Sequence, residues 1–339
     1  MGLTPEITAW IRSETGAGVS DSRPLYTWRP GAPQLLELDS GGQAVLRQAP
    51  GRVGRHDGFA HESAAMIMAE EHRVPAPRLI AVDLDGSVAG HPALLMTAVP
   101  GTSRIPGTAT VERLEALGRG AAMMARIRTE PTPDLPAVTG PIDIGGGAAG
   151  RRRAVRWEAA TEPERQAMVD DLCAATGWDP ERARRTIPDP EGGRSRLLED
   201  AAELLDRLPV PAGEPVLVHG DLWQGNTMWD GDRLTALIDW DSAGVGHPGI
   251  DLGCVRHDAV LFFGAEAAGP VLAGWEQATG TRPDPATVAY WDVRVALNTT
   301  ADMIRGMDVA ESYGRPEVTP ELAALRRDAF LEAGLRGLG

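Results

Sequence analysis

The chain has 339 residues, enough to bury a substantial core as one two-lobed unit or as two domains. Its formal net charge of −15 argues against nucleic acid as a partner, because nucleic-acid-binding proteins carry a basic face. The acidity is compatible with a cationic small molecule, although a generally acidic surface for solubility is the favoured explanation.

No apolar stretch is long enough to span a membrane, and the first residues lack the basic and apolar regions of a signal peptide. The two cysteines form no recognisable disulfide framework, as is usual in a reducing compartment. We therefore expect a cytoplasmic protein, a monomer or a homodimer, that binds neither nucleic acid nor membrane.

The patterns along the chain predict an α+β protein. Strand-like and helical runs alternate in the first third, with strands expected over 43–47, 78–82 and 93–99 and a helix over 60–68. The rest is mostly helical in pattern, with helices expected over 111–128, 195–208, 289–303 and 321–335, and a Pro- and Gly-rich loop over 131–150. We expect a β-rich N-terminal lobe over residues 1–99 and a larger, mostly helical lobe over 100–339.

The most informative segment is His-Gly-Asp-Leu-Trp-Gln-Gly-Asn at 219–226. A short apolar strand leads into it, and a second strand, an Asp-Gly-Asp turn and a third strand follow it, so that Asp239 is delivered at the end of the hairpin. We therefore expect Asp221, Asn226 and Asp239 to converge. Three oxygen-bearing side chains suit a hard cation such as Mg²⁺, which also relieves the repulsion between carboxylates.

Each of these residues alone is also a common turn residue, but their combination suits phosphoryl transfer. This reaction requires a group that accepts the proton of the attacking hydroxyl and oxygen ligands that hold metal against nucleotide phosphates. Asp221 is the candidate for the first role. Asn226 and Asp239 are the candidates for the second.

The sequence here resembles the aminoglycoside phosphotransferase and choline-kinase-like family, small-molecule relatives of the protein kinases. The resemblance rests on the His-Gly-Asp motif with its Asn, on the Ile-Asp-Trp-Asp run at 238–241, and on the segment 244–253 after it. It implies a bilobal protein-kinase-like fold with Asp221 as catalytic base and with Asn226 and Asp239 as metal ligands. It also assigns supporting places to three further residues, His219, Asp241 and Asp251, the last of them as a residue at the start of a helix.

A kinase also needs a basic residue on an N-terminal strand and a glutamate on the next helix. Arg47 and Glu62 are the candidates, in the correct order, although a surface arginine and a solvated glutamate would look the same. The resemblance further places the hinge between lobes after the last strand, where the nucleobase is bound by the segment Met96, Thr97, Ala98 and Val99.

The chain contains no lysine, so all 33 basic residues are arginines. Any phosphate clamp must therefore be built from arginine, whose forked donors suit phosphate but differ from lysine in reach. The absence also excludes a Walker-type phosphate loop and a lysine Schiff base. No convincing glycine-rich loop is found at 25–34, where the kinase fold requires one.

Two other classes of function remain to be compared with a kinase. The run Gly-Val-Gly-His-Pro-Gly at 244–249 matches a dinucleotide-binding fingerprint, but it lies late in the chain, and Asp239 and Asp241 would face a pyrophosphate. A non-catalytic nucleotide-binding pseudokinase is the third possibility. The presence of all three motif residues favours an active enzyme over it.

The expected function is transfer of the γ-phosphate of ATP or GTP to a hydroxyl group of a small molecule, with Mg²⁺ as cofactor. An antibiotic is the favoured acceptor, whether an aminoglycoside, macrolide, cyclic peptide or nucleoside, and a metabolic kinase acting on choline, a sugar or homoserine is the alternative. Four aspartates of the C-terminal part are unranked candidates for acceptor contacts, Asp258, Asp292, Asp302 and Asp308. The basic cluster at 151–153 is either an exposed helix start or a contact for an anion.

Overall fold

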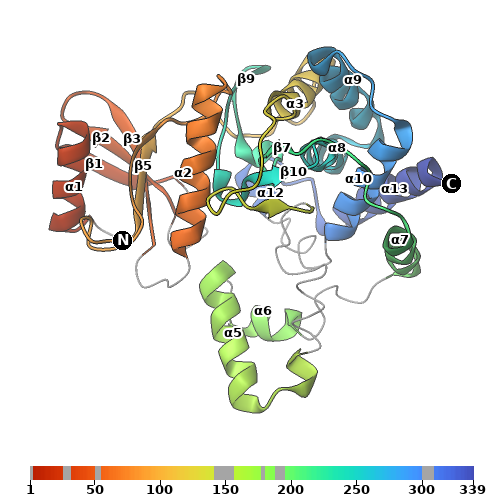
Figure 1. Cartoon of the computed structure of the whole chain (residues 1–339), viewed down its shortest axis with the longest axis horizontal. Helices are drawn as coiled ribbons and strands as arrows, with labels where there is room; N and C mark the ends of the chain where they lie inside the picture. Colours follow the sequence, from red (N-terminus) through yellow and green to blue (C-terminus); the bar gives the residue numbers. More distant parts are fainter. Residues whose placement is uncertain are drawn as a thin grey trace.

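The computed structural model describes residues 3–25, 32–49, 55–140, 156–176, 180–187, 195–299 and 309–339. The chain forms an N-terminal antiparallel sheet followed by a mainly helical part (Figure 1), which is the α+β class expected. Across these described ranges, no helix is both long and apolar enough to cross a lipid bilayer.

The N-terminal part is a five-stranded sheet with one helix on each face. The strands pair antiparallel in the order β1-β2-β3-β5-β4, with bounds Val19–Pro24, Gln34–Leu38, Gln43–Gln48, Ala93–Thr97 and Leu79–Asp83. Alternate side chains of a strand point to opposite faces. Leu95 accordingly packs with α1 (Pro5–Thr15), whereas Leu94 packs in the cluster that includes α2 (Arg55–Glu71).

The C-terminal part is built around helix α8 (Gly249–Phe263), which is buried from Gly249 to Phe262. A helix with no solvent-exposed face lies in the interior, with other elements packed around it. Helices α3 (Val111–Met124), α9 (Ala268–Thr279), α10 (Pro285–Asn298) and α13 (Pro320–Leu338) pack against α8, and α7 (Arg196–Arg207) packs on α10 and α13. The remaining described helices are α5 (Glu162–Thr176), α6 (Pro180–Thr186) and α12 (Val309–Ser312).

Two small sheets lie between the N-terminal sheet and the helices. The hairpin of β8 (Thr227–Asp230) and β9 (Arg233–Leu237) is antiparallel. The second sheet has the order β6-β10-β7, with bounds Ala137–Val138, Gly244–Gly246 and Val216–Val218. These short strands frame the His-Gly-Asp segment on both sides, and β7 delivers His219 directly at its end.

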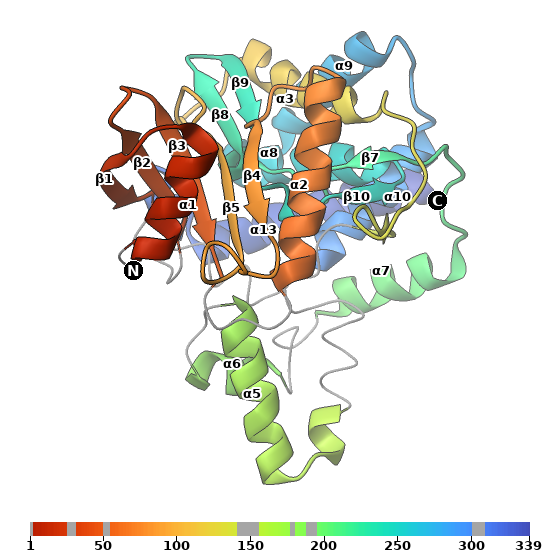
Figure 2. The ribbon, with the colours of Figure 1, turned by 60° about the vertical axis from the view of Figure 1, so that its left-hand side comes forward.

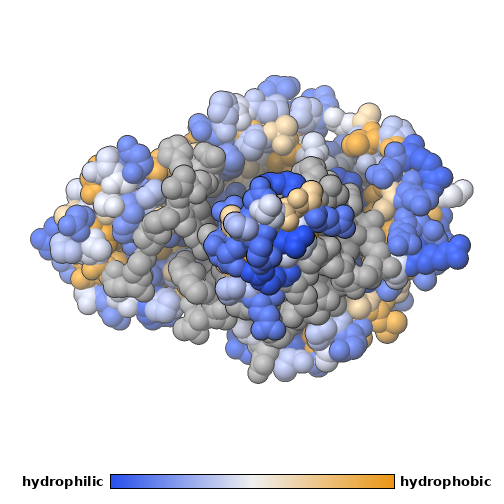
Figure 3. All heavy atoms as spheres, turned by 90° about the horizontal axis from the view of Figure 1, so that it is seen from below, coloured by the Kyte–Doolittle hydropathy of each residue, from blue (hydrophilic) through white to orange (hydrophobic). Residues whose placement is uncertain are grey.

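Helices α5 and α6 pack on each other around a small apolar cluster of their own and stand apart from the remainder (Figure 2). Seen from that end, the described residues at the centre of the view are mainly hydrophilic (Figure 3). The preceding basic cluster at 151–153 lies outside the described residues.

Most predicted elements are present with shifted ends. The helix expected over 60–68 is α2, which begins at Arg55, and the helix expected over 289–303 is α10, which begins at Pro285. The strand expected to continue to residue 99 ends at Thr97. The sequence did not reveal α1, β1, α5 or α9. The division into lobes at residue 99 stays a prediction.

Candidate active site

Asp221 and Asn226 lie at the two ends of one tight loop. The side-chain amide of Asn226 donates to the backbone carbonyl of Asp221 at 2.9 Å and to its carboxylate Oδ2 at 3.0 Å. A 3₁₀ turn over Gln224–Asn226 closes the loop before β8. Because the Asn226 nitrogen faces Asp221, the amide oxygen lies on the opposite side of that group, away from the carboxylate.

Asp251 fixes the start of this loop. Its carboxylate accepts the backbone N–H of His219 at 2.8 Å and of Gly220 at 3.0 Å, and the side chain is buried. Gly220 has φ +78°, and a Cβ there would overlap the carbonyl oxygen of Ser242. The position therefore requires glycine. Asp251 lies in the first turn of α8, but its carboxylate holds the loop and does not cap its own helix.

His219 connects the loop to the strand that carries the next acidic residue. Its Nε2 lies 2.9 Å from the carbonyl oxygen of Ile238, so that nitrogen donates, and the ring lies 4.7 Å from that of Trp240. Burial lowers the pKa of His219, which keeps the imidazole neutral. A neutral, buried ring that joins two segments is a structural support and not a proton carrier.

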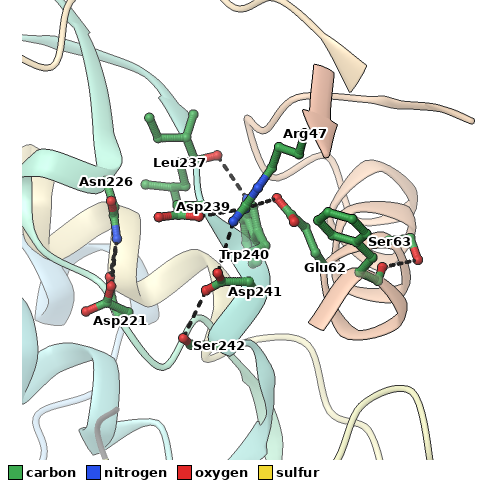
Figure 4. Close-up of polar contacts among 12 residues, drawn as sticks. Arg47, Glu62, Ser63, Asp221, Asn226, Leu237, Asp239, Trp240, Asp241 and Ser242 are labelled. Carbon is green, nitrogen blue, oxygen red and sulfur yellow. Dashed lines mark hydrogen bonds and ion pairs between the residues drawn. The ribbon is translucent and has the colours of Figure 1, made fainter. Parts of the chain in front are cut away.

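Arg47 is the centre of the charged cluster shown in Figure 4. Its Nη1 lies 2.7 Å from Glu62 Oε1 and 2.7 Å from Asp239 Oδ1, and its Nη2 lies 3.1 Å from Asp241 Oδ2. The expected strand and helix therefore do bring Arg47 and Glu62 together. The sequence did not reveal that the same guanidinium also reaches two carboxylates from the C-terminal part.

Burial and charge shift the ionisation of this cluster. Burial alone would lower the pKa of Arg47, but Glu62, Asp239 and Asp241 outweigh it and raise the pKa above its ordinary value. Burial raises the pKa of Glu62 to about 7, with Arg47 opposing the rise. The cluster thus places one buried cation in contact with three carboxylates.

The carboxylates of Asp221 and Asp239 have different surroundings. Burial raises the pKa of Asp221 well above its usual value, and the charges of Asp239 and Asp241 add to the rise. The Asp239 side chain is 44% exposed, and its backbone is left-handed with φ 66° and ψ 62°. Few non-glycine residues adopt this conformation, although Asp does so more often than most, and such residues cluster at functional sites.

The hinge segment is only partly available for a ligand. Met96 is buried in the core, and the Thr97 amide donates to the carbonyl oxygen of Arg78 at 2.9 Å. The Thr97 hydroxyl also accepts the Arg78 amide at 2.9 Å. Four hinge residues were expected at the nucleobase. Of these, Ala98 and Val99 lie after the end of the paired strand and are therefore the two available to a ligand.

Two aspartates expected as acceptor contacts are instead buried in protein contacts. Asp258 accepts from the backbone and side chain of Gln224, and Asp292 forms a bidentate pair with Arg256. The expectation was wrong for both, because each carboxylate satisfies a buried donor. The other two candidates, Asp302 and Asp308, lie outside the described residues, as do residues 26–31 of the segment in which a phosphate loop was sought.

The glycines at 244–249 allow close packing against neighbouring parts of the chain. Gly244 and Gly246 lie in β10, where a Cβ would overlap the carbonyl oxygens of Pro136 and Val138 on the neighbouring strand. β10 pairs parallel with β6 and antiparallel with β7, and within the described residues no strand follows helix α8, which comes after these glycines. A dinucleotide fingerprint belongs to a parallel strand-helix-strand unit, so the structure argues against that alternative.

Comparisons with known proteins agree with this arrangement. A family model described as the phosphotransferase enzyme family matches residues 34–291. The viomycin phosphotransferase of Streptomyces vinaceus is 38% identical over 91 residues, which are 25% of this chain and 29% of that relative. The matched stretch is thus less than a third of the relative's length.

Solved structures show the same fold. An amicoumacin kinase in complex with AMP-PNP and Ca²⁺ has a TM-score of 0.53 at 12% identity, over 92% of this chain and 88% of that one. A thermostable mutant of the aminoglycoside phosphotransferase APH(4)-Ia, with ADP and hygromycin B bound, also gives 0.53 at 17% identity, over 97% and 99%. The expected fold class is confirmed. Because the family model covers most of the chain, the protein belongs to the phosphotransferase enzyme family.

Proposed function

We propose that the protein is a magnesium-dependent kinase that transfers the γ-phosphate of ATP or GTP to a hydroxyl group of a small molecule. One observation carries this proposal: the loop that pairs Asp221 with Asn226 lies in the same site as the cluster in which Arg47 contacts Asp239. A proton acceptor, oxygen ligands and a phosphate-binding cation are the parts that phosphoryl transfer needs.

The donor set suits Mg²⁺. Across the described residues, no three His, Cys, Asp or Glu side chains are placed to hold a metal by themselves. The protein would therefore supply the Asn226 amide oxygen and the Asp239 carboxylate, and phosphate oxygens would complete the shell. Magnesium, when bound, neutralises phosphate charge. Arg47 would supply positive charge for the phosphates, and Ala98 and Val99 would meet the base.

Asp221 acts on the acceptor. Its carboxylate orients the hydroxyl group and takes its proton as the oxygen attacks the γ-phosphorus in line. The new oxygen–phosphorus bond forms while the bond from the γ-phosphorus to the bridging oxygen breaks, and the nucleoside diphosphate leaves with its electron pair. Asn226 holds Asp221 in place for this attack through the 3.0 Å contact.

The favoured acceptor is a cationic antibiotic. The relative with 38% identity over its matched stretch is a viomycin phosphotransferase, and hygromycin B is bound in one structure of the same fold. The net charge of −15 favours attraction of a cation. A KM for the acceptor that rises with salt is therefore expected.

The test is a phosphate-transfer screen with labelled ATP and GTP and with Mg²⁺. The panel contains viomycin, an aminoglycoside, a macrolide and a nucleoside antibiotic, together with choline, sugars and homoserine. We expect transfer to an antibiotic that stops with EDTA and resumes with added Mg²⁺. Transfer to a metabolite but to no antibiotic would mean that the protein is a metabolic kinase and not an antibiotic kinase. Nucleotide binding without transfer to any acceptor would contradict the proposal.

A further inference from the structure

A second aspartate of α8 holds the same catalytic loop from its other end. The Oδ2 atom of Asp258 lies 3.1 Å from the backbone nitrogen of Gln224 and 3.1 Å from its side-chain Nε2, so one carboxylate oxygen accepts both bonds. Both side chains are buried, Gln224 at 0% and Asp258 at 6% exposure. Water therefore cannot replace either bond without a rearrangement of the loop.

Asp251 and Asp258 are seven residues apart, which is two helical turns, and both project from the same side of α8. Asp251 accepts the amides of His219 and Gly220, before Asp221, whereas Asp258 accepts the amide of Gln224, after it. One rigid helix thus fixes the backbone on both sides of the proposed base.

Gln224 in turn holds the next residues of the loop through hydrogen bonds. Its carbonyl oxygen accepts the backbone amide and, at 2.7 Å, the hydroxyl group of Thr227. Between them lies Asn226, whose side chain holds Asp221. A shift of Gln224 therefore displaces Asn226 and disturbs its contact with Asp221.

We propose that Asp258 is a positioning residue that sets the geometry of Asp221 and Asn226 by holding Gln224; the inference rests on the kinase function proposed above. Asp258 must supply a hydrogen-bond acceptor and not a negative charge, because a single carboxylate oxygen accepts both bonds. The charged group that faces it, Arg315, keeps its own partner, Glu317. An asparagine oxygen can therefore take over the role of the carboxylate.

The experiment compares Asp258→Leu with Asp258→Asn. For the leucine variant we expect kcat to fall about 10- to 100-fold, because small displacements of reacting groups cost this much, while the nucleotide KM changes less than about threefold. The asparagine variant should recover kcat to within about threefold of the wild type. Asp292→Asn is the matched control, since it changes a buried carboxylate that pairs with Arg256. It should lower the melting temperature and leave kcat unchanged.

Hydrogen exchange of the segment 219–227 gives a readout that needs no turnover. Exchange should be faster in Asp258→Leu than in the wild type and near normal in Asp258→Asn. The inference is overturned if the leucine variant keeps the wild-type kcat and exchange, or if the asparagine variant is as impaired as the leucine variant. If the wild type transfers no phosphate, the proposed function fails, and the exchange result still decides the role of Asp258.

Discussion

The pair of Arg47 and Glu62 offers a way to separate folding stability from nucleotide binding. The two side chains are 10% and 1% exposed, so both charges are largely out of water. Removing one partner of a buried pair costs about 3–5 kcal/mol, because the other charge is left unpaired. Burial already raises the pKa of Glu62 to about 7, so this group can take up a proton when Arg47 is absent. We therefore expect Arg47→Met to lower the free energy of unfolding by about 2–3 kcal/mol at neutral pH.

Of the three carboxylates that Arg47 contacts, only Glu62 is fully buried, and adding Glu62→Gln to Arg47→Met removes that buried carboxyl group. The double variant should regain most of the lost stability, because an amide pays a smaller desolvation penalty than a carboxylate. It should not regain nucleotide affinity, because no cation is restored for the phosphates.

Urea unfolding followed by tryptophan fluorescence measures the stability, and calorimetric titration with ATP and Mg²⁺ measures the affinity. A double variant no more stable than Arg47→Met would refute the argument from buried charge. Wild-type affinity in Arg47→Met would refute the role of Arg47 in phosphate binding.

Three further predictions concern the loop and its support. Asp251→Leu leaves the amides of His219 and Gly220 without an acceptor and should cost about 1–3 kcal/mol for each in urea unfolding, whereas an unchanged midpoint would contradict the contacts. Gly220→Ala should cost about 2 kcal/mol or more, because its φ of +78° is strained for alanine and the new Cβ overlaps Ser242; wild-type stability would show that the loop can relax. Burial lowers the pKa of His257 to about 3, below its unfolded value, so the native state resists protonation and stability falls as pH drops below about 6.5. His257→Gln should reduce the slope of the free energy of unfolding against pH by up to about 1.4 kcal/mol per pH unit. Parallel stability curves for the variant and the wild type would refute this role of His257.

The catalytic segment could be predicted because the residues that define it lie close together in the sequence. The spacing between Asp221 and Asn226 and the hairpin that delivers Asp239 lie within a run of 19 residues, and turn chemistry fixes their relation. Arg47 and Glu62 could be paired because a kinase needs a basic residue on a strand and a glutamate on the next helix, and the chain offers both in that order. Without the motif at 219–226, the two residues would have looked like ordinary surface residues.

The contacts that support the site could not be predicted, because they join distant segments. The Arg47 contact with Asp241 spans 194 residues, and the bonds from Asp251 to the loop span 31 and 32. A buried aspartate and a ligand-binding aspartate look alike in sequence, which is why Asp258 was first grouped with acceptor contacts. Strand β1 was missed because its residues are almost all exposed and polar, so no hydrophobic alternation marks it.

The central claim is that Asp221 is the base of a phosphoryl transfer. Asp221→Asn keeps the shape of the side chain and removes its capacity to take a proton. Single-turnover transfer to the acceptor found in the screen should fall by about 10²-fold or more, whereas the Kd for ATP with Mg²⁺ should stay within about threefold of the wild type. Transfer in the variant at a rate close to that of the wild type would contradict the account.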